Sequence, residues 1–480
     1  MVKKGRDVKI KNIGGRDYAY DMISYWDKDL KKYRKKSVYL GVVTNKEKKE
    51  YHPKAERDLT NVDTGEKEII QNFGDSYSIA QVVEKCGFLA ALKGLDVNFD
   101  TLMSLVCFKI LKSSAMQYAE SWSLGNYCSY LYKSANLKSQ RISDFLKELG
   151  NERLWRSFFN EYIASITGEK TGIIVDSTGM PNEIDFPLSA WGNHGGDYEM
   201  ETRLMIVVDK ASGKPLYFRY MAGNIIDVST LKNTICELTE MGVKSSFALV
   251  DAGFYSEDNI KELFANGIAF LTRLTSNRKL HKELIENSAD MEKASNMVTY
   301  NKRALFVKKE KVDLFGNKGF AYIVCDVKRK GDESNKFLTA AKEDGLSDDE
   351  IDKELNKKGK FVMISSEDLP INEVIPLYYT RQAAENLFGI SKSFLDLLPL
   401  RTHSIETFRG YLMLTFITLT IYLEIKNRLN GKYTVEGAMI EMGNLMCKIY
   451  AKNVIVSEPT KKMKEIAELL SYMVPMKLGV

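Results

Sequence analysis

Four polar side chains recur at helical spacing in the last quarter of the chain, and together they could present a phenol, a guanidinium, a carboxylate and an ammonium group on one face. These residues are Tyr378, Arg381, Glu385 and Lys392. On a helix that begins near Pro376 and turns about 100° per residue, all four lie on one side, while Leu387 and other apolar residues face a core. The same stripe also occurs on ordinary solvated helices that carry Arg–Glu and Glu–Lys pairs.

Two aspartates elsewhere could join Glu385 in a metal site. Asp176 and Asp251 each end a short apolar run that indicates a β-strand, and a carboxylate at a strand end can project into a crevice at the sheet edge. Taken singly, such an aspartate is more often a turn residue. Three converging carboxylates repel one another unless a cation joins them. We therefore expect Asp176, Asp251 and Glu385 to bind two Mg²⁺ or Mn²⁺ ions per active site, an arrangement that suits phosphoryl transfer.

The elements that must position these carboxylates alternate between strands and helices. From residue 171 onward the order is β-β-β-α-β-α-β, which predicts a mixed α/β sheet. We expect strands over 172–175, 203–209, 215–221, 247–251, 268–273 and 360–366, a loop and a helix within 224–241, and a helix over 256–266. Residues 275–359 interrupt this order with further β-like stretches and a charged helix near 339–358, so we expect an insertion there.

The pattern divides the chain into six parts. They are a basic β-rich segment with a small β-meander (1–60), a helical module (61–166), the first part of the α/β core (167–274), a β-rich insertion (275–359), the second part of the core with the Glu385 helix (360–430), and a helical tail (431–480).

Charge is unevenly distributed along the 480 residues. Residues 1–60 contain 17 Lys and Arg against 9 Asp and Glu, although the net charge of the whole chain is only +5. Such a segment suggests an anionic partner, or a basic extension that has none. The six cysteines are scattered without a CxxC pair, so a zinc site is not expected. The apolar run at 410–423 is short for a membrane span and contains three threonines, so we expect a buried core helix and no membrane partner.

The four polar residues have the spacing Tyr-(2)-Arg-(3)-Glu-(6)-Lys, which resembles the signature of prokaryotic insertion-sequence transposases of the DDE class. Three further blocks are similar to that group. They are Asp176-Ser-Thr, Gly223-Asn224 followed by Asp227, and Asp251-Ala-Gly-Phe-Tyr255. The resemblance covers roughly residues 171–425.

The resemblance implies an RNase H-like mixed-sheet core interrupted by a mainly β insertion, preceded by the β-meander and the helical module and followed by the helical tail. It implies that Asp176, Asp251 and Glu385 are the catalytic, metal-binding residues. It also implies DNA phosphate contacts by Tyr378, Arg381 and Lys392, to which we add Arg401, His403 and Arg409 as further candidates.

The function implied by the resemblance is that of a Mg²⁺-dependent DNA transposase. Such an enzyme would bind the terminal inverted repeats of its own mobile element as a homodimer, cleave the element ends, and join the 3′-hydroxyl ends to target DNA. We expect it to lie in the cytoplasm, associated with the nucleoid. Two alternatives remain open: an RNase H-like nuclease without strand transfer, and a catalytically inactive DNA-binding protein derived from a transposase.

Other polar and aromatic residues are weaker candidates. His194 could be a catalytic acid, and Trp191 could stack on a DNA base, although a loop histidine and a core or loop anchor are the simpler interpretations. We expect solvated side chains at Glu199, Glu201 and Asp209. The basic run at residues 31–36, expected in the connection of the β-meander, could follow DNA without sequence preference.

Overall fold

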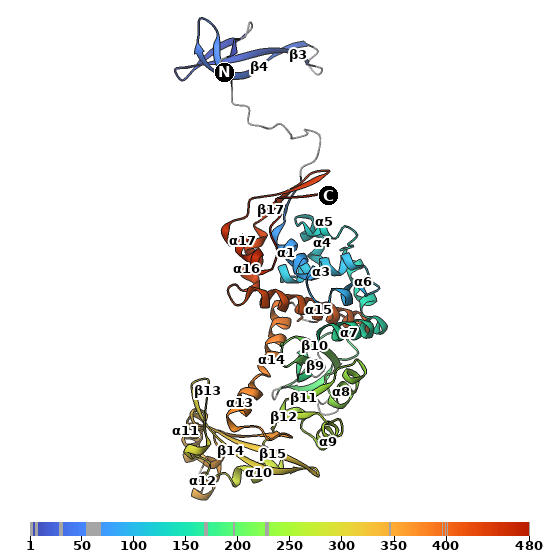
Figure 1. The fold of residues 1–480 in the computed structure, drawn as a ribbon, viewed down its shortest axis with the longest axis vertical. Coiled ribbons are helices and arrows are strands. Elements are labelled where there is room, and N and C mark those ends of the chain that lie inside the picture. The colour runs from blue at the N-terminus through green and yellow to red at the C-terminus, as the bar shows by residue number, and fades with distance from the viewer. Residues whose placement is uncertain are drawn as a thin grey trace. The chain divides into compact units, whose positions relative to one another are not determined.

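The chain forms two compact units, Met1–Lys67 and Glu68–Val480, in the computed structural model of the protein (Figure 1). The structure describes residues 3–4, 8–27, 32–53, 69–167, 171–194, 197–225, 230–344, 347–395, 397–398, 400 and 402–479.

The first unit is a five-stranded antiparallel sheet with the strand order β1-β5-β4-β3-β2. Its strands are β1 (Lys3–Lys4), β2 (Lys9–Ile13), β3 (Arg16–Asp27), β4 (Lys32–Asn45) and β5 (Glu50–Pro53). The basic run that we expected in a connection begins β4 instead, because Lys32 to Lys36 pair with β3 in a two-stranded ribbon. Trp26 and Tyr33 form an exposed aromatic pair on this ribbon, with ring centroids 5.0 Å apart.

The second unit starts with a short strand and a set of helices. These elements are β6 (Ile69–Asn72), α1 (Gly74–Glu84), α2 (Leu89–Lys93), α3 (Phe99–Leu111), α4 (Ala119–Leu124), α5 (Cys128–Leu131), α6 (Ser139–Leu149) and α7 (Glu152–Ile166). Buried residues recur at helical spacing in α6, at Ile142, Phe145, Leu146 and Leu149, so one face of the helix packs into the core.

The C-terminal part of the chain is not only helical, which corrects the expected helical tail. Its elements are α16 (Val435–Gly443), β17 (Met446–Ile449), β18 (Asn453–Val456), α17 (Lys461–Leu469) and β19 (Lys477–Gly479). The strands join β6 in a four-stranded sheet with the order β19-β18-β17-β6. Strands of four residues give too short an alternation of buried and exposed side chains to be recognised without their partner strand.

Helix α15 (Ile405–Leu429) is the expected core helix, and it packs against α3, α6 and β10 (Figure 1). By length and composition it is apolar enough to cross a membrane, but 89% of its apolar 18-residue stretch is buried inside the protein. A Cβ atom added at Gly410 would collide with the backbone of α6, so glycine is required for this close approach. Ser404 caps its first turn by accepting a hydrogen bond from the backbone N–H of Thr407 at 3.2 Å.

A ten-stranded mixed sheet confirms the predicted mixed α/β fold. Its order is β10-β9-β7-β11-β12-β16-β15-β14-β13, and β8 pairs with β9 outside this path. The strands are β7 (Thr171–Pro181), β8 (Ala190–His194), β9 (Asp197–Asp209), β10 (Pro215–Ala222), β11 (Ser245–Val250), β12 (Ala269–Leu274), β13 (Met297–Tyr300), β14 (Arg303–Leu314), β15 (Asn317–Asp326) and β16 (Lys360–Ser365).

Strand β11 runs parallel to both β7 and β12, and helices α8 (Leu231–Glu240) and α9 (Glu257–Ala265) make the crossovers. Leu231, Ile235 and Leu238 bury the inner face of α8. Strand β11 is buried along Phe247–Val250, as expected for a parallel strand that is covered on both faces.

Residues 275–359 contribute strands to this sheet rather than forming a sheet of their own, because β15 pairs with β16 along its length. The segment also contains α10 (Lys279–Glu286), α11 (Val327–Asp344) and α12 (Asp348–Lys357). The prediction of a single charged helix near 339–358 is therefore wrong, because α11 and α12 divide this region. Ser347 and Glu350 form a capping box that starts a separate helix, α12.

Candidate active site

Asp176 and Asp251 lie at the same level on two adjacent parallel strands. The pairing of β7 with β11 ends at Val175 and Val250, and the two aspartates are the next residue on each strand. Asp251 follows the end of β11, as predicted. Asp176 does not end its strand, because β9 continues to pair with β7 as far as Pro181. The strand-end interpretation of Asp176 is therefore wrong, although the predicted proximity of the two aspartates is observed.

The segment that carries Glu385 is not one continuous helix. Helix α13 (Ile371–Tyr379) begins after Pro370 and contains Pro376 in its interior, so the helix begins earlier than predicted. Arg381 has helical backbone angles but lies in a break before α14 (Gln382–Gly389), which a π-helical turn over Ile390–Phe394 extends. A proline inside a helix removes one backbone hydrogen bond. The predicted single helix is therefore divided into two helices and a π-helical turn.

Arg381 holds the three predicted carboxylates together. Its Nη1 atom lies 3.0 Å from Oδ1 of Asp176 and 3.5 Å from Oδ1 of Asp251. Its Nη2 atom lies 2.6 Å from Oε1 of Glu385. The sequence therefore placed the three acids correctly near one point, but the guanidinium that we expected on DNA phosphate instead forms ion pairs with all three.

Burial and like charge dominate the electrostatics of the site. The side chain of Asp176 is 8% exposed, whereas those of Asp251 and Glu385 are 40% and 49% exposed. Burial is the main cause that raises the pKa of Asp176 to about 7; the charge of Arg381 opposes this shift, and the smaller effects of Asp251 and Glu385 add to it. A proton or a cation is thus needed to neutralise this carboxyl group near neutral pH.

The two adjacent tyrosines differ in exposure, and Tyr378, which we expected on the polar face of the helix, is the buried one. Tyr378 is 7% exposed, and burial raises the pKa of its phenol to about 12. Tyr379 is 39% exposed, and its ring stacks on that of Tyr300 with centroids 5.1 Å apart. Tyr378 lies on the buried side of α13 with Val374 and Ile375, so the predicted polar face does not present it to solvent.

Lys392 is bound within the protein rather than extended into solvent. Its Nζ atom donates hydrogen bonds to Oγ1 of Thr178 and to the carbonyl oxygen of Gly179, both at 2.7 Å. Burial lowers the pKa of Lys392, and the carboxylate of Glu201 opposes this shift, so the two charges lie close enough to interact. The π-helical turn that follows Glu385 is therefore fastened to β7.

Glu201 was not identified from the sequence, where a solvated side chain was expected. It is fully buried in β9, and a Cβ atom added at Gly179 or Gly192 would collide with its carboxylate. These glycines lie on β7 and β8, on either side of β9. Only the strand pairing brings them around Glu201, so no local sequence signal marks the residue.

The remaining predicted residues are dispersed. His403 is exposed, with Nδ1 3.3 Å from the carbonyl oxygen of Asp185, whereas Arg409 donates to the Tyr220 hydroxyl at 2.7 Å and to the Gly150 carbonyl oxygen at 3.1 Å. Arg409 is thus committed to protein contacts. Two predicted residues, Arg401 and Asp227, lie outside the described residues, as does the side chain of His194.

Trp191 is not an anchor in a core, since it is 67% exposed on β8. Of the three acids expected in solvent, Glu199 is exposed, and Asp209 accepts hydrogen bonds from the backbone N–H and the hydroxyl of Ser212 in the β9–β10 turn. Trp191 therefore remains available to a partner molecule, whereas Asp209 has a local structural role.

The three carboxylates around Arg381 suit a divalent cation. Among the residues that the structure describes, no three His, Cys, Asp or Glu side chains are gathered as ready metal ligands. At this site the Arg381 guanidinium lies between the carboxylates and supplies the positive charge that balances them. Three carboxylates are hard oxygen ligands, and the raised pKa of Asp176 indicates a group that a cation would stabilise in its charged form. The residues therefore fit a metal once the guanidinium leaves the centre.

The chain matches one protein family and is similar to a solved structure. No curated protein matches the chain. Among solved structures, the chain is similar to the piggyBac transposase in a synaptic complex with hairpin DNA, with 12% identity, a TM-score of 0.43, and coverage of 78% of this chain and 80% of that one. The family described as the transposase DDE domain matches residues 167–421, which is more than half of the chain and includes all three acids. The chain therefore belongs to the transposase DDE domain family.

Proposed function

We propose that the protein is a DNA transposase of a prokaryotic insertion sequence and that Asp176, Asp251 and Glu385 form its catalytic site. The observation that carries this proposal is the convergence of the three carboxylates on the single guanidinium of Arg381. Family membership supports the reaction class, and the convergence supports the residues.

The sheet topology supports an RNase H-like core in residues 167–274 and 360–430. The antiparallel strands β7, β9 and β10 are followed by β11 and β12, which lie parallel to β7, with helices in the two crossovers. Residues 275–359 would then be an insertion between β12 and β16, and β14 and β15 extend the core sheet from it.

Asp176, Asp251 and Glu385 would hold two Mg²⁺ or Mn²⁺ ions. Bound metal would activate the attacking oxygen and stabilise the leaving oxygen during phosphoryl transfer. Arg381 would then exchange its ion pairs with the acids for a DNA phosphate, which its planar fork of donors can bind in two places. Lys392 would act as a positioning residue, because it holds the Glu385 segment against β7.

The DNA partners would be the terminal inverted repeats of the element and the target site. A homodimer would bring two ends together, cleave each end, and direct the freed 3′-hydroxyl groups to target DNA. The basic β3–β4 ribbon and the helices before residue 167 would bind DNA outside the catalytic site, close to the nucleoid. The positive charge of residues 1–60 supports DNA binding by the β3–β4 ribbon.

Glu385→Gln tests the site directly. The side chain is half-exposed, so the fold should tolerate the amide. With DNA that carries the sequences flanking the reading frame, we expect Mg²⁺-dependent strand cleavage to fall at least 100-fold while DNA binding changes less than twofold. Glu373→Gln on the exposed side of α13 is the matched control.

Cleavage that survives Glu385→Gln would show the site assignment to be wrong. Pre-cleaved ends then separate a transposase from a nuclease. Joining of these ends to a plasmid supports the transposase, whereas cleavage of intact ends without any joining would support an RNase H-like nuclease. Absence of both reactions in the wild-type protein, with DNA binding retained, would favour a non-catalytic DNA-binding protein.

A further inference from the structure

A large cavity with basic walls opens beside the candidate catalytic site. Its volume is about 1050 Å³, and Asp251 and Arg381 lie on its margin. The other acidic residue in its lining is Glu286. Six further cations line it: Arg273, Lys282, Arg329, Lys353, Lys357 and Lys360. We name this cavity, between the end of β12, α10, α12 and α13, the basic cleft.

Three of the six cations are already engaged by the protein. Arg329 pairs with Glu333 at 2.6 Å, and Lys357 pairs with Glu354 at 2.5 Å. The Nζ atom of Lys360 donates hydrogen bonds to Oγ of Ser288 at 3.0 Å and to Oδ1 of Asn356 at 2.7 Å. These three residues therefore shape the cleft more than they attract a ligand.

Arg273, Lys282 and Lys353 have no acidic partner within 4 Å among the residues that the structure describes. Lys282 and Lys353 are exposed, and the guanidinium of Arg273 lies over the ring of Phe361 at 4.9 Å. Three cations in the lining of one cavity repel one another, and an anionic ligand would relieve that repulsion.

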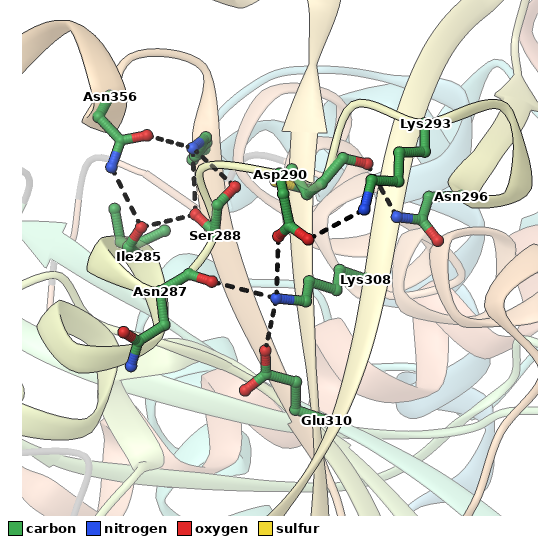
Figure 2. A network of polar contacts seen from close by, with 11 residues as sticks. Ile285, Asn287, Ser288, Asp290, Lys293, Asn296, Lys308, Glu310 and Asn356 are labelled. Carbon is green, nitrogen blue, oxygen red and sulfur yellow. Dashed lines mark hydrogen bonds and ion pairs between the residues drawn. The ribbon is translucent and has the colours of Figure 1, made fainter.

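The wall of the cleft is held in place by a polar network (Figure 2). The amide of Asn356 in α12 donates a hydrogen bond to the carbonyl oxygen of Ile285 in α10 at 3.3 Å. The Nζ atom of Lys360 donates to both Asn356 and Ser288. Behind them, Lys308 in β14 donates to the carbonyl oxygen of Asn287 at 3.0 Å. Because these bonds tie α10, α12 and the sheet together, the cleft is formed before any ligand binds.

An aromatic surface adjoins the basic wall. Tyr379 lines the cleft and is partly exposed, and the nearly parallel ring of Tyr300 supports it from behind, with 12° between the two planes. A rigid, supported phenol ring beside cations offers stacking to a nucleobase while the cations bind phosphates.

We infer that the basic cleft binds a short single-stranded stretch of DNA. This stretch continues from the phosphate that, in the proposed function, reacts beside Asp251. A volume of about 1050 Å³ is near the upper end of small-ligand sites and admits a few nucleotides of one strand, whereas a duplex, whose major groove alone is about 12 Å wide, does not fit. The inference rests on the proposed function, because it assigns the path of the DNA through that same site. Arg273, Lys282 and Lys353 bind the phosphates, and Tyr379 stacks on a base.

The test compares two triple variants that lose the same charge. Arg273→Gln/Lys282→Gln/Lys353→Gln empties the cleft of unpaired cations. Lys302→Gln/Lys311→Gln/Lys318→Gln removes three exposed lysines of the β13–β15 region that do not line it. Binding of a fluorescein-labelled random-sequence 12-mer, single-stranded or duplex, is measured by anisotropy without Mg²⁺ over a salt series, with thermal unfolding as the folding check.

We expect the cleft variant to bind the single strand about tenfold or more weakly, with a salt slope shallower by about 2, since each phosphate contact on a single strand contributes about 0.7. The control variant should stay within about twofold of the wild type. Tyr379→Ala should weaken single-strand binding about tenfold, and Tyr379→Phe should restore it, because stacking needs the ring and not the hydroxyl.

Equal losses in both triple variants, or an unchanged single-strand affinity in the cleft variant, would overturn the inference. Competition by deoxyadenosine monophosphate as strong as by the 12-mer would also overturn it, in favour of a mononucleotide site. These failures are distinct from a failure of the proposed function. Wild-type protein that cleaves and joins element ends, while the cleft variant binds the single strand normally, would refute only the cleft.

Discussion

Arg381 donates a hydrogen bond from Nη1 to Oδ1 of Asp176 over 3.0 Å, and this pair lies at the centre of the candidate active site. The same nitrogen is 3.5 Å from Asp251, and the other terminal nitrogen is 2.6 Å from Glu385. Arg381 thus serves as an internal counter-ion for three acids that would otherwise repel one another. Metal binding and the Arg381 ion pairs therefore compete for the same carboxylate oxygens.

Removal of this counter-ion should destabilise the metal-free protein. We expect Arg381→Gln to lower the free energy of unfolding by on the order of 2 kcal/mol without metal, because three carboxylates remain close together. Addition of Mg²⁺ should raise the unfolding temperature more in this variant than in the wild type, since no guanidinium competes. Differential scanning fluorimetry with and without Mg²⁺ measures both effects.

The matched control for Arg381 is Arg156→Gln. Arg156 pairs with Glu152 on the exposed face of α7 at 2.9 Å, so its loss should change stability by less than about 0.5 kcal/mol. Identical unfolding temperatures for Arg381→Gln and the wild type in metal-free buffer would contradict the counter-ion role.

Asp176 should make the stability of the metal-free protein depend on pH. Its folded pKa of about 7 lies above the ordinary value of 3.8, so the folded state retains a proton that the unfolded state releases. The retained proton therefore adds to the free energy of unfolding; this added stability is fully present below about pH 4 and is lost as pH rises through 7. Asp176→Asn, which stays neutral, should be more stable than the wild type at pH 8 by a few kcal/mol and should show a flatter profile in urea unfolding.

Mg²⁺ affinity should show the complementary pH dependence. A carboxylate must lose its proton before it binds a metal, so the wild-type affinity should rise between pH 5 and pH 7 and level off above it. Isothermal titration calorimetry at several pH values measures the affinity together with the protons released. An affinity that is constant from pH 5 to pH 8 would show that Asp176 is not the titrating ligand.

The buried charges of Lys392 and Glu201 should be energetically coupled. In urea unfolding, Lys392→Met and Glu201→Gln should each destabilise the protein, and the double variant should lose less than the sum, with a coupling free energy above about 1 kcal/mol. The control Lys426→Met removes an exposed lysine of α15 and should change stability by less than about 0.5 kcal/mol. Strict additivity of the two substitutions would rule out the coupling.

The β3–β4 ribbon of the N-terminal unit should bind DNA without sequence preference. Lys32→Gln/Lys35→Gln/Lys36→Gln should reduce duplex affinity and make the salt slope shallower by up to about 3, because each phosphate contact on B-DNA contributes about 0.9. The control Lys46→Gln/Lys48→Gln/Lys49→Gln removes equal charge from the turn between β4 and β5. Equal losses in the two variants would show that net charge matters and the ribbon does not.

The periodicity of the sequence predicted the mixed sheet and the closeness of Asp176 and Asp251 because both depend on local signals, whereas no local signal placed Glu385 beside the two aspartates. Apolar runs that end at Asp176 and Asp251 place carboxylates beside each other once β7 and β11 pair. The continuation of β7 beyond Asp176 could not be predicted, since it depends on pairing with β9, and the polar residues of β7 after Asp176 do not indicate a strand.

Other features depend on contacts between distant segments. Tyr378 is buried and Tyr379 is exposed because α13 packs against other parts of the fold on the side that carries Tyr378, and the polar residue types along this segment do not show which side that is. The burial of Glu201 depends on Gly179 and Gly192, which lie on two other strands. Arg381 and Lys392 have side chains suited to phosphate, but only the folded chain shows that Arg381 pairs with carboxylates and that Lys392 donates hydrogen bonds to β7.

The pairing of β7 with β11 also sets where the chain can change in length. Side chains on a strand alternate between the two faces of the sheet, so one residue inserted between Ser245 and Val250 would turn Asp251 away from Asp176. The connection from β12 to β16 carries no such constraint, because strand β16 returns to the sheet whatever the length of the intervening turns. Related chains should therefore conserve the length of β11 to the residue and vary freely at the turn of Phe315 and Gly316, where β14 meets β15.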